Sequence, residues 1–511
     1  MSSRCPRTAL STQCTADSIT PSPDAAQAST AAMLFILTPG AQRRLWDFPN
    51  EIWIQIFEAV SNSPDLSSVS RTCRLFHQLA LEPMFEDLRF THAGKAMNVA
   101  RVLDENADLR RRVRSLTFGL TRLFEADDGV AFNFHGIGTP TEPHIARQRE
   151  FDGLLGRALD FPNLTTVHLV RASVTHAVYN VLGALSRLET LSVIQCALAP
   201  LRVPPGSSAE AHILTPIGVK RLIYRRNRLT PSAHEGLGEL LHPVLLTRLA
   251  NLEELETDWD DSLTIPHGTP SQPRLRDVTL YVLDARAGAE LRNLPTYLAS
   301  RPSISTLRVE APDPAVRMTS AHMPALRKFV GAPGVARAIL PDSGVLAVDT
   351  TTYAARVADI VGLLEAAPRG LTDLRIALRA WDEEILYAAA QLLPELERLE
   401  IWYHGGSPRE TFIMSLGTQL IPRMTRLRVL KVFPLPGAGG AADATDAARA
   451  DDMHNESRWK PEQRGVFSRA QMRSFLSAWT RYCPSLREVK LAPLSYWVRE
   501  DGLSAWDCFS E

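Results

Sequence analysis

A short pattern of apolar positions recurs along the chain from about residue 110 onward: apolar-x-x-apolar-x-apolar. Its last two apolar positions alternate with polar ones, as in a β-strand that buries one face. An amphipathic segment with helical spacing precedes most copies, for example Phe151 to Leu159 and Ile385 to Leu392. One strand and one helix cannot bury their apolar faces alone, but stacked copies can. The pattern therefore predicts an α/β fold in which strand–helix units stack as a solenoid.

The spacing of the copies sets the size of the predicted repeat. Most clear copies are 22 to 33 residues apart, which leaves room for one helix and two turns. Five of them carry a proline two positions before the first apolar residue, where it ends the preceding helix and favours extended backbone. The first apolar residues of the clearest copies are Leu164, Leu188, Val219, Leu252, Leu275, Ile304, Leu371, Leu396, Leu427 and Leu486.

One copy matches a known repeat signature in full. Residues Leu188 to Leu198 follow L-x-x-L-x-L-x-x-C-x-L, with Cys196 at the turn, whereas most other copies lack the Asn or Cys. The series resembles the leucine-rich repeat family in an irregular form. The resemblance implies a horseshoe whose parallel sheet lines the concave face, with the polar strand positions exposed there. The repeat pattern is absent from two stretches, at about 122–149 and 437–464. We expect these stretches to be loops inserted between repeats.

A different pattern lies at residues 45–90, which are expected to form three short helices. Pro49 suits the first turn of a helix. The next apolar residues fall at helical spacing and are expected on one face of that helix: Ile52, Ile56, Phe57 and Val60. About 45 residues make a marginal core, so the surplus of large apolar side chains suggests that a partner covers one face. The alternative is an ordinary three-helix cap on the array.

This segment resembles an F-box, the small helical module that docks onto the adaptor subunit of SCF-type ubiquitin ligases. Phe48-Pro49 stands where that family has Leu-Pro, and Cys73-Arg74 with Phe76 matches the stretch that opens its third helix. Thr72, where the family has Val, is a mild departure. The resemblance implies that the adaptor, and through it the cullin, is bound by Phe48, Pro49, Ile52, Ile56, Phe57, Leu66, Val69, Cys73, Phe76 and Leu79.

Composition and charge narrow the class of protein. The formal net charge is −1 and the pI is about 6.9, so nothing favours broad binding to nucleic acid or to anionic membranes. The six cysteines are scattered without a CxxC pair, which is typical of reduced thiols in the cytosol or nucleus. No apolar segment approaches the roughly 20 residues that span a bilayer.

Residues that could carry catalysis or bind a metal do not converge in the sequence. His135 and His144 lie beside Glu142 and Glu150, but their spacing fits neither an HExxH helix nor a zinc-finger ligand set. No G-x-S-x-G motif occurs. We therefore expect no catalytic residue, no metal site and no cofactor.

The repeats instead offer a binding surface at their polar strand positions. The aromatic residues Tyr281, Trp402 and Phe433 are the expected hot spots, because large rings supply contact area at little rotamer cost. Packing against a neighbouring repeat is the alternative for each, and a one-residue shift of strand register would turn Phe433 inward. Charges of both signs alternate along this face, which favours a protein target over a polyanion. The other expected partner-binding residues are Arg221, Arg225, Glu254, Glu256 and Arg398.

The expected organisation is a disordered segment at 1–40, an F-box at 41–90, the repeat array at 91–498 and a tail at 499–511. By resemblance, the chain would be the non-catalytic substrate-recognition subunit of an SCF-type ubiquitin ligase in the cytosol or nucleus. Its F-box would bind the adaptor, and its repeats would bind an unidentified target protein. The alternatives are an F-box scaffold or regulator that promotes no ubiquitination, and a repeat-bearing small-molecule sensor or enzyme.

Overall fold

The computed structural model describes residues 49–60, 63–90, 93–119, 149, 151–198, 218–226, 228–229, 249–259, 274–282, 290–311, 317–318, 321–341, 343–406, 408–435, 468–492, 495–499 and 505–509. The chain divides into two compact units, Met1–Met84 and Phe85–Glu511. The expected disordered segment at 1–40 and, apart from Arg149, both expected loops lie outside the described residues.

In the first unit, three helices pack around a small core. They are α2 (Asn50–Ala59), α3 (Ser63–Ser70) and α4 (Arg74–Glu86), whose last residues fall beyond the division between the units. The Pro49 carbonyl accepts the Ile52 N–H at 3.1 Å and so closes the first turn of α2. The core contains Trp53, Phe57, Leu66 and Ala80. The sequence pattern at 45–90 thus placed three helices correctly.

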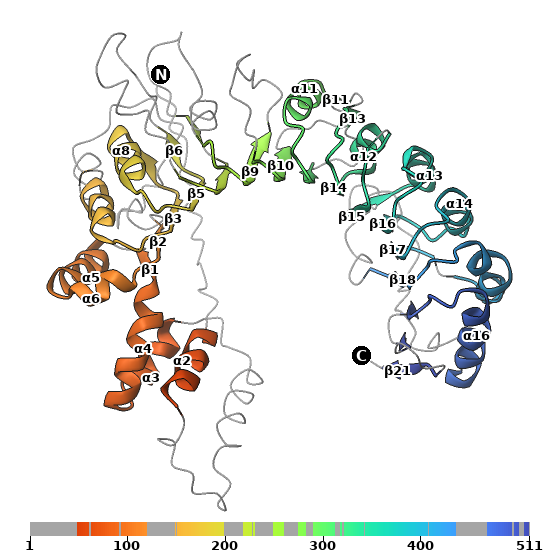
Figure 1. Cartoon of the computed structure of the whole chain (residues 1–511), viewed down its shortest axis with the longest axis horizontal. Coiled ribbons are helices and arrows are strands. Elements are labelled where there is room, and N and C mark those ends of the chain that lie inside the picture. The colour runs from red at the N-terminus through yellow and green to blue at the C-terminus, as the bar shows by residue number, and fades with distance from the viewer. Residues whose placement is uncertain are drawn as a thin grey trace, which may run out of the picture. The chain divides into compact units, whose positions relative to one another are not determined.

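In the second unit, sixteen strands of the described residues form one sheet (Figure 1). Every neighbouring pair from β1 to β19 is parallel, and the last two pairs are antiparallel. In sheet order, the strands are β1 (Asp87–Phe90), β2 (Ser115–Gly119), β3 (Thr166–Val170), β5 (Thr190–Ile194), β7 (Arg221–Arg225), β9 (Glu254–Trp259), β10 (Asp277–Val282), β12 (Thr306–Glu310), β14 (Lys328–Gly331), β15 (Ala347–Ala355), β16 (Asp373–Leu378), β17 (Arg398–Tyr403), β18 (Val429–Pro434), β19 (Glu488–Ala492), β20 (Ser495–Val498) and β21 (Asp507–Phe509).

Helices and short strands connect the strands of this sheet. Within this unit, the strands line the inner side of a curve and the helices lie on its outer side (Figure 1). The helices are α5 (Ala93–Glu105), α6 (Ala107–Arg112), η3 (Arg157–Asp160), α8 (His176–Ala184), α11 (Leu294–Ala299), α12 (Pro333–Ile339), α13 (Val357–Ala366), α14 (Glu384–Leu392), α15 (Glu410–Ser415), η4 (Leu416–Leu420), η5 (Ile421–Arg423) and α16 (Arg469–Tyr482). The short strands are β4 (Ser173–Val174), β6 (Ala197–Leu198) and β8 (Arg228–Leu229) in one small sheet, and β11 (Glu290–Leu291) and β13 (Arg317–Met318) in another. This arrangement confirms the predicted α/β solenoid.

The alternation of apolar and polar residues fixes which side of each strand is buried. In β7, for example, Leu222 and Tyr224 are buried toward the helices, while Arg221 and Arg225 lie on the opposite, concave face. In β18, Leu430 and Val432 are buried, so Phe433 shares the concave face with the other polar strand positions. The shifted register considered for this copy does not occur.

The C-terminal residues end the sheet with antiparallel strands. β20 pairs with β19 and β21 pairs with β20, and Trp497 and Trp506 are buried beside them. The segment 499–511 is therefore not a tail, because β21 lies within it. A stack of repeats has an apolar end that must be covered, and the two tryptophans provide that cover. No helix in the described part of the chain has both the length and the apolar character needed to cross a membrane.

Candidate functional site

Helix α2 has two apolar stripes, and only one of them belongs to the core. Trp53 and Phe57 point inward, where the Phe76 ring centroid lies 4.7 Å from that of Trp53 and 5.4 Å from that of Phe57. Ile52 and Ile56 precede these residues by one position, which turns them about 100° around the helix. Their exposed fractions are 40% and 45%, against 3% for Phe57. The exposed pair forms an apolar surface on the outside of α2.

The structure divides the ten predicted adaptor-binding residues between surface and core. Pro49, Ile52 and Ile56 are exposed. Phe57 and Leu66 are buried in the core of the helical unit, and contact of the ten residues with the adaptor stays a prediction. Four others are half-buried. Val69, Phe76 and Leu79 pack against the core, whereas Cys73 is not part of that cluster. Phe48 lies outside the described residues.

The concave face of β7, β9 and β10 carries paired charges. Arg221 lies 3.2 Å from Glu254, and Arg225 lies 3.2 Å from Glu256 on the neighbouring strand. The Arg225 guanidinium also lies 3.3 Å from the centroid of the Tyr281 ring, two strands away. Burial, reinforced by nearby carboxylates, raises the pKa of the Tyr281 phenol to about 12. One face of this predicted hot spot is therefore already covered by an arginine of the same chain.

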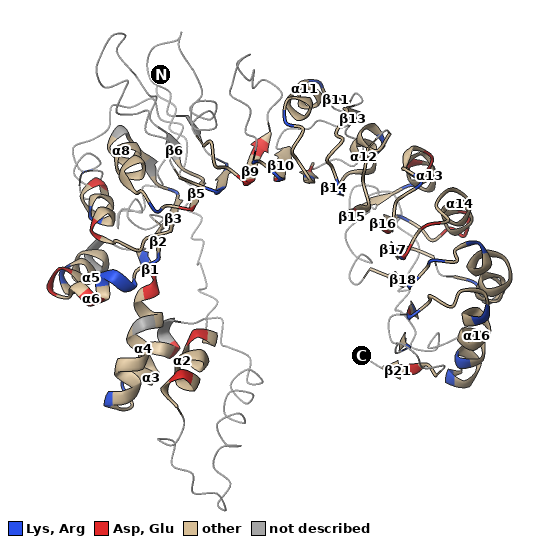
Figure 2. Ribbon diagram, in the orientation of Figure 1, with Lys and Arg blue, Asp and Glu red and all other residues tan. Residues whose placement is uncertain are grey.

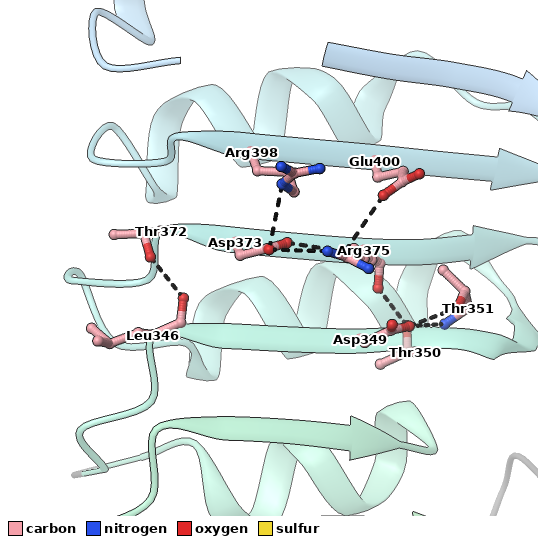
Figure 3. Close-up of polar contacts among 9 residues, drawn as sticks. All are labelled: Leu346, Asp349, Thr350, Thr351, Thr372, Asp373, Arg375, Arg398 and Glu400. Atoms are coloured by element: carbon pink, nitrogen blue, oxygen red, sulfur yellow. Dashed lines mark hydrogen bonds and ion pairs between the residues drawn. The ribbon is translucent and has the colours of Figure 1, made fainter. Parts of the chain in front are cut away.

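A second charged cluster lies on β15, β16 and β17 (Figure 3). Arg375 contacts Asp373 at 3.3 Å and Glu400 at 3.4 Å, and Arg398 contacts Asp373 at 3.5 Å. Asp349 occupies the position of β15 that pairs with Arg375. These contacts join the charged side chains of β16 and β17 to one another. Both signs of charge occur along the strands of this unit (Figure 2), as the sequence predicted.

Aromatic and lysine side chains meet on β17, β18 and β19. Trp402 pairs with Phe433 across the strands, and their ring centroids are 4.5 Å apart with an interplanar angle of 53°. The Lys490 Nζ lies 5.2 Å from the Phe433 ring centroid. Lys431 lies 2.5 Å from Glu488. Both rings remain half-exposed on the concave face, where a partner can reach them.

In the described residues, no three His, Cys, Asp or Glu side chains are grouped as a metal ion would require. Burial raises the pKa of the Cys196 thiol to about 11, and it also raises the pKa of Tyr179 and of Tyr224. An activated nucleophile has a lowered pKa, and burial shifts the pKa of these three groups in the opposite direction. His135 and His144 lie outside the described residues.

Comparison with known proteins identifies the helical unit. Residues 45–89 match the F-box-like family. They form an F-box-like domain. F-box proteins are generally non-catalytic subunits of ubiquitin ligases, and their F-box domains typically bind the SCF adaptor. No curated protein matches the chain in sequence.

Among solved structures, the chain is similar to "Crystal structure of TLR13-ssRNA13 complex" at 12% identity and a TM-score of 0.30. The similarity covers 69% of this chain and 44% of that one, so this chain spans less than half of the length of that protein. The solenoid assignment rests on the strand order and burial described above.

Proposed function

We propose that the chain is the substrate-recognition subunit of an SCF-type ubiquitin ligase. The observation that carries the proposal is the F-box-like domain at 45–89, with Ile52 and Ile56 exposed together on α2. Covering such an apolar pair is favourable because it removes apolar area from water. The adaptor subunit is the partner that this module would recruit, and the adaptor would bring the cullin.

The repeat unit would supply target recognition. Its concave face combines half-exposed rings with charges of both signs, as protein interfaces commonly do. In this division, residues 41–90 bind the adaptor and residues 91–498 bind a target protein in the cytosol or nucleus. The ubiquitin-transfer chemistry resides in other subunits, so no catalytic residue is required here.

The test separates a ligase receptor from a scaffold that only binds the adaptor. Tagged wild-type chain and the Ile52→Asp/Ile56→Asp variant are expressed in cells, and the proteins that co-purify with each are identified. A target should co-purify with both chains, but its ubiquitination should fall and its half-life should lengthen with the variant. If targets of both chains are ubiquitinated and degraded equally, the ligase role is wrong and the scaffold alternative remains.

A further inference from the structure

The exposed face of α16 carries a row of arginines. This helix has no acidic residue (Figure 2), and Arg469, Arg473 and Arg481 are all exposed on it. Residues four apart on a helix lie in one inclined row, and here that row is Arg469, Arg473, Ser477 and Arg481. At a rise of about 1.5 Å per residue, the row is about 18 Å long. We call its three arginines the α16 arginine row.

The three arginines have no counter-charge within the described part of the chain. There, no ion pair or side-chain hydrogen bond engages their guanidinium groups. By contrast, Arg426 and Arg428, which follow η5, are paired with Glu395 and Glu397. Exposed arginines that the chain itself leaves without a carboxylate attract an anionic partner.

The segments around α16 add to its positive charge. The Cys483 thiol, just after α16, donates to the Met424 carbonyl at 3.3 Å, so the exposed Arg423 lies near the C-terminal end of the helix. In the described residues 408–435 and 468–487, nine basic residues stand against one acid, Glu410. The nine are Arg409, Arg423, Arg426, Arg428, Lys431, Arg469, Arg473, Arg481 and Arg487. An anion that approaches α16 is therefore attracted by neighbouring segments as well as by the row.

The side chains beside the α16 arginine row are short. The adjacent row of residues four apart is Ala470, Ser474, Ala478 and Tyr482, and all four are exposed. Tyr482 is 53% exposed and ends this row at the C-terminal turn. The side-chain rows of a second helix fit between such rows when two helices cross at about −50°. Arginine and tyrosine are also among the residues that dominate the binding energy of protein interfaces.

We propose that α16 binds an acidic helix of a partner protein. Carboxylates four residues apart on that helix contact the α16 arginine row, and its neighbouring side chains pack over Ala470, Ser474 and Ala478. Arginine suits this contact because its planar guanidinium binds both oxygens of a carboxylate at once. The helix α16 lies on the outer side of the curve (Figure 1), so this contact is separate from the concave face that would bind the target.

Nucleic acid and membrane surfaces fit α16 less well than an acidic helix does. Nucleic-acid-binding domains typically have a pI above about 9 and contact several phosphates, whereas this chain has a formal net charge of −1. A helix that lies on a membrane inserts its apolar face. The apolar face of α16 is not available for this, because Met472, Leu476 and Trp479 are buried in the repeat unit.

The test is a fluorescence-anisotropy titration of the purified full-length chain into a labelled alanine-rich helical peptide whose glutamates are spaced four residues apart. Its affinity should fall about tenfold or more with Arg473→Glu/Arg481→Glu, because two attractions become repulsions. The same peptide with lysines in place of the glutamates should bind this variant more tightly than it binds the wild type. A peptide with the same glutamates but interrupted by prolines cannot form the helix and should bind the wild type several-fold more weakly. Raised salt should weaken binding of the glutamate peptide.

The matched control is Arg337→Glu/Arg356→Glu, the same double reversal at exposed arginines in α12 and at the N-terminus of α13. It should change the affinity less than about twofold, and all three proteins should melt within a few degrees of one another. Should Arg481→Glu destabilise the chain, Arg473→Glu alone still decides. The proposal is overturned if the glutamate peptide does not bind the wild type, if both double variants bind it equally, or if the proline-interrupted peptide binds as well. Tighter binding of a DNA duplex or of phosphatidylserine vesicles, lost in the α16 variant, would overturn it in favour of those ligands.

Discussion

Replacing Ile52 and Ile56 by aspartate should abolish adaptor binding while leaving α2, α3 and α4 folded. Ile52 and Ile56 are 40% and 45% exposed. Together they expose slightly less surface than one fully exposed isoleucine, and a partner can cover this surface. Covering it contributes about 1.3 to 2.5 kcal/mol, taking about 1.5 to 3 kcal/mol per fully buried isoleucine. Two carboxylates enclosed without partners cost several kcal/mol more. A total above about 4 kcal/mol weakens binding roughly a thousandfold.

The assay is calorimetric titration of the purified SCF adaptor into the full-length chain. The control is Leu159→Asp/Met414→Asp, because these residues of the repeat unit are 49% and 55% exposed and take the same change. The control should bind the adaptor as the wild type does, and all three proteins should melt within a few degrees of one another. Wild-type affinity in the Ile52/Ile56 variant, or an equal loss in the control, would show that the adaptor does not bind specifically at Ile52 and Ile56.

Three other predictions concern the core and the chemistry of buried groups. Phe57→Ala should destabilise the helical unit by about 3–5 kcal/mol. Amide hydrogen exchange should then become faster throughout residues 49–60 and 63–84, and protection equal to that of the wild type would mean that Phe57 does not belong to the core. Burial raises the pKa of the Cys196 thiol to about 11, so at pH 8 this thiol should resist iodoacetamide in the folded chain. Rapid alkylation of Cys196, detected by mass spectrometry, would contradict this prediction. Gly417→Ala should lower the melting temperature, because a Cβ there would lie 2.3 Å from the Trp479 Nε1 and overpacking costs about 1–3 kcal/mol. The control Gly153→Ala meets nothing within 4 Å, and equal melting of the two variants would contradict this packing.

The strands of the repeat unit could be predicted well because their signal is local. Alternation with a period of two fixes the buried face once a strand is recognised. Trp402 and Phe433 therefore lie on the concave face where the pattern placed them. The contact between Arg225 and Tyr281 could not be predicted, because it crosses an intervening strand and depends on side-chain reach.

The helical unit was harder to interpret because α2 is apolar on two sides. Trp53, Phe57 and Val60 form an i, i+4, i+7 stripe, and this signal could have identified the core side. The prediction instead grouped Ile52 and Ile56 with Phe57, since helical periodicity alone does not say which of two adjacent stripes faces the chain's own core. The C-terminal strand β21 was missed because three residues carry no usable periodicity.

We propose that residues 45–89 bind the SCF adaptor directly. Purified full-length chain and purified adaptor are mixed, and their association is followed by titration calorimetry and by light scattering during size exclusion. Direct binding predicts a complex of one chain with one adaptor and a dissociation constant of about 1 µM or tighter. Separate elution of the two proteins, with no heat of binding, would contradict it.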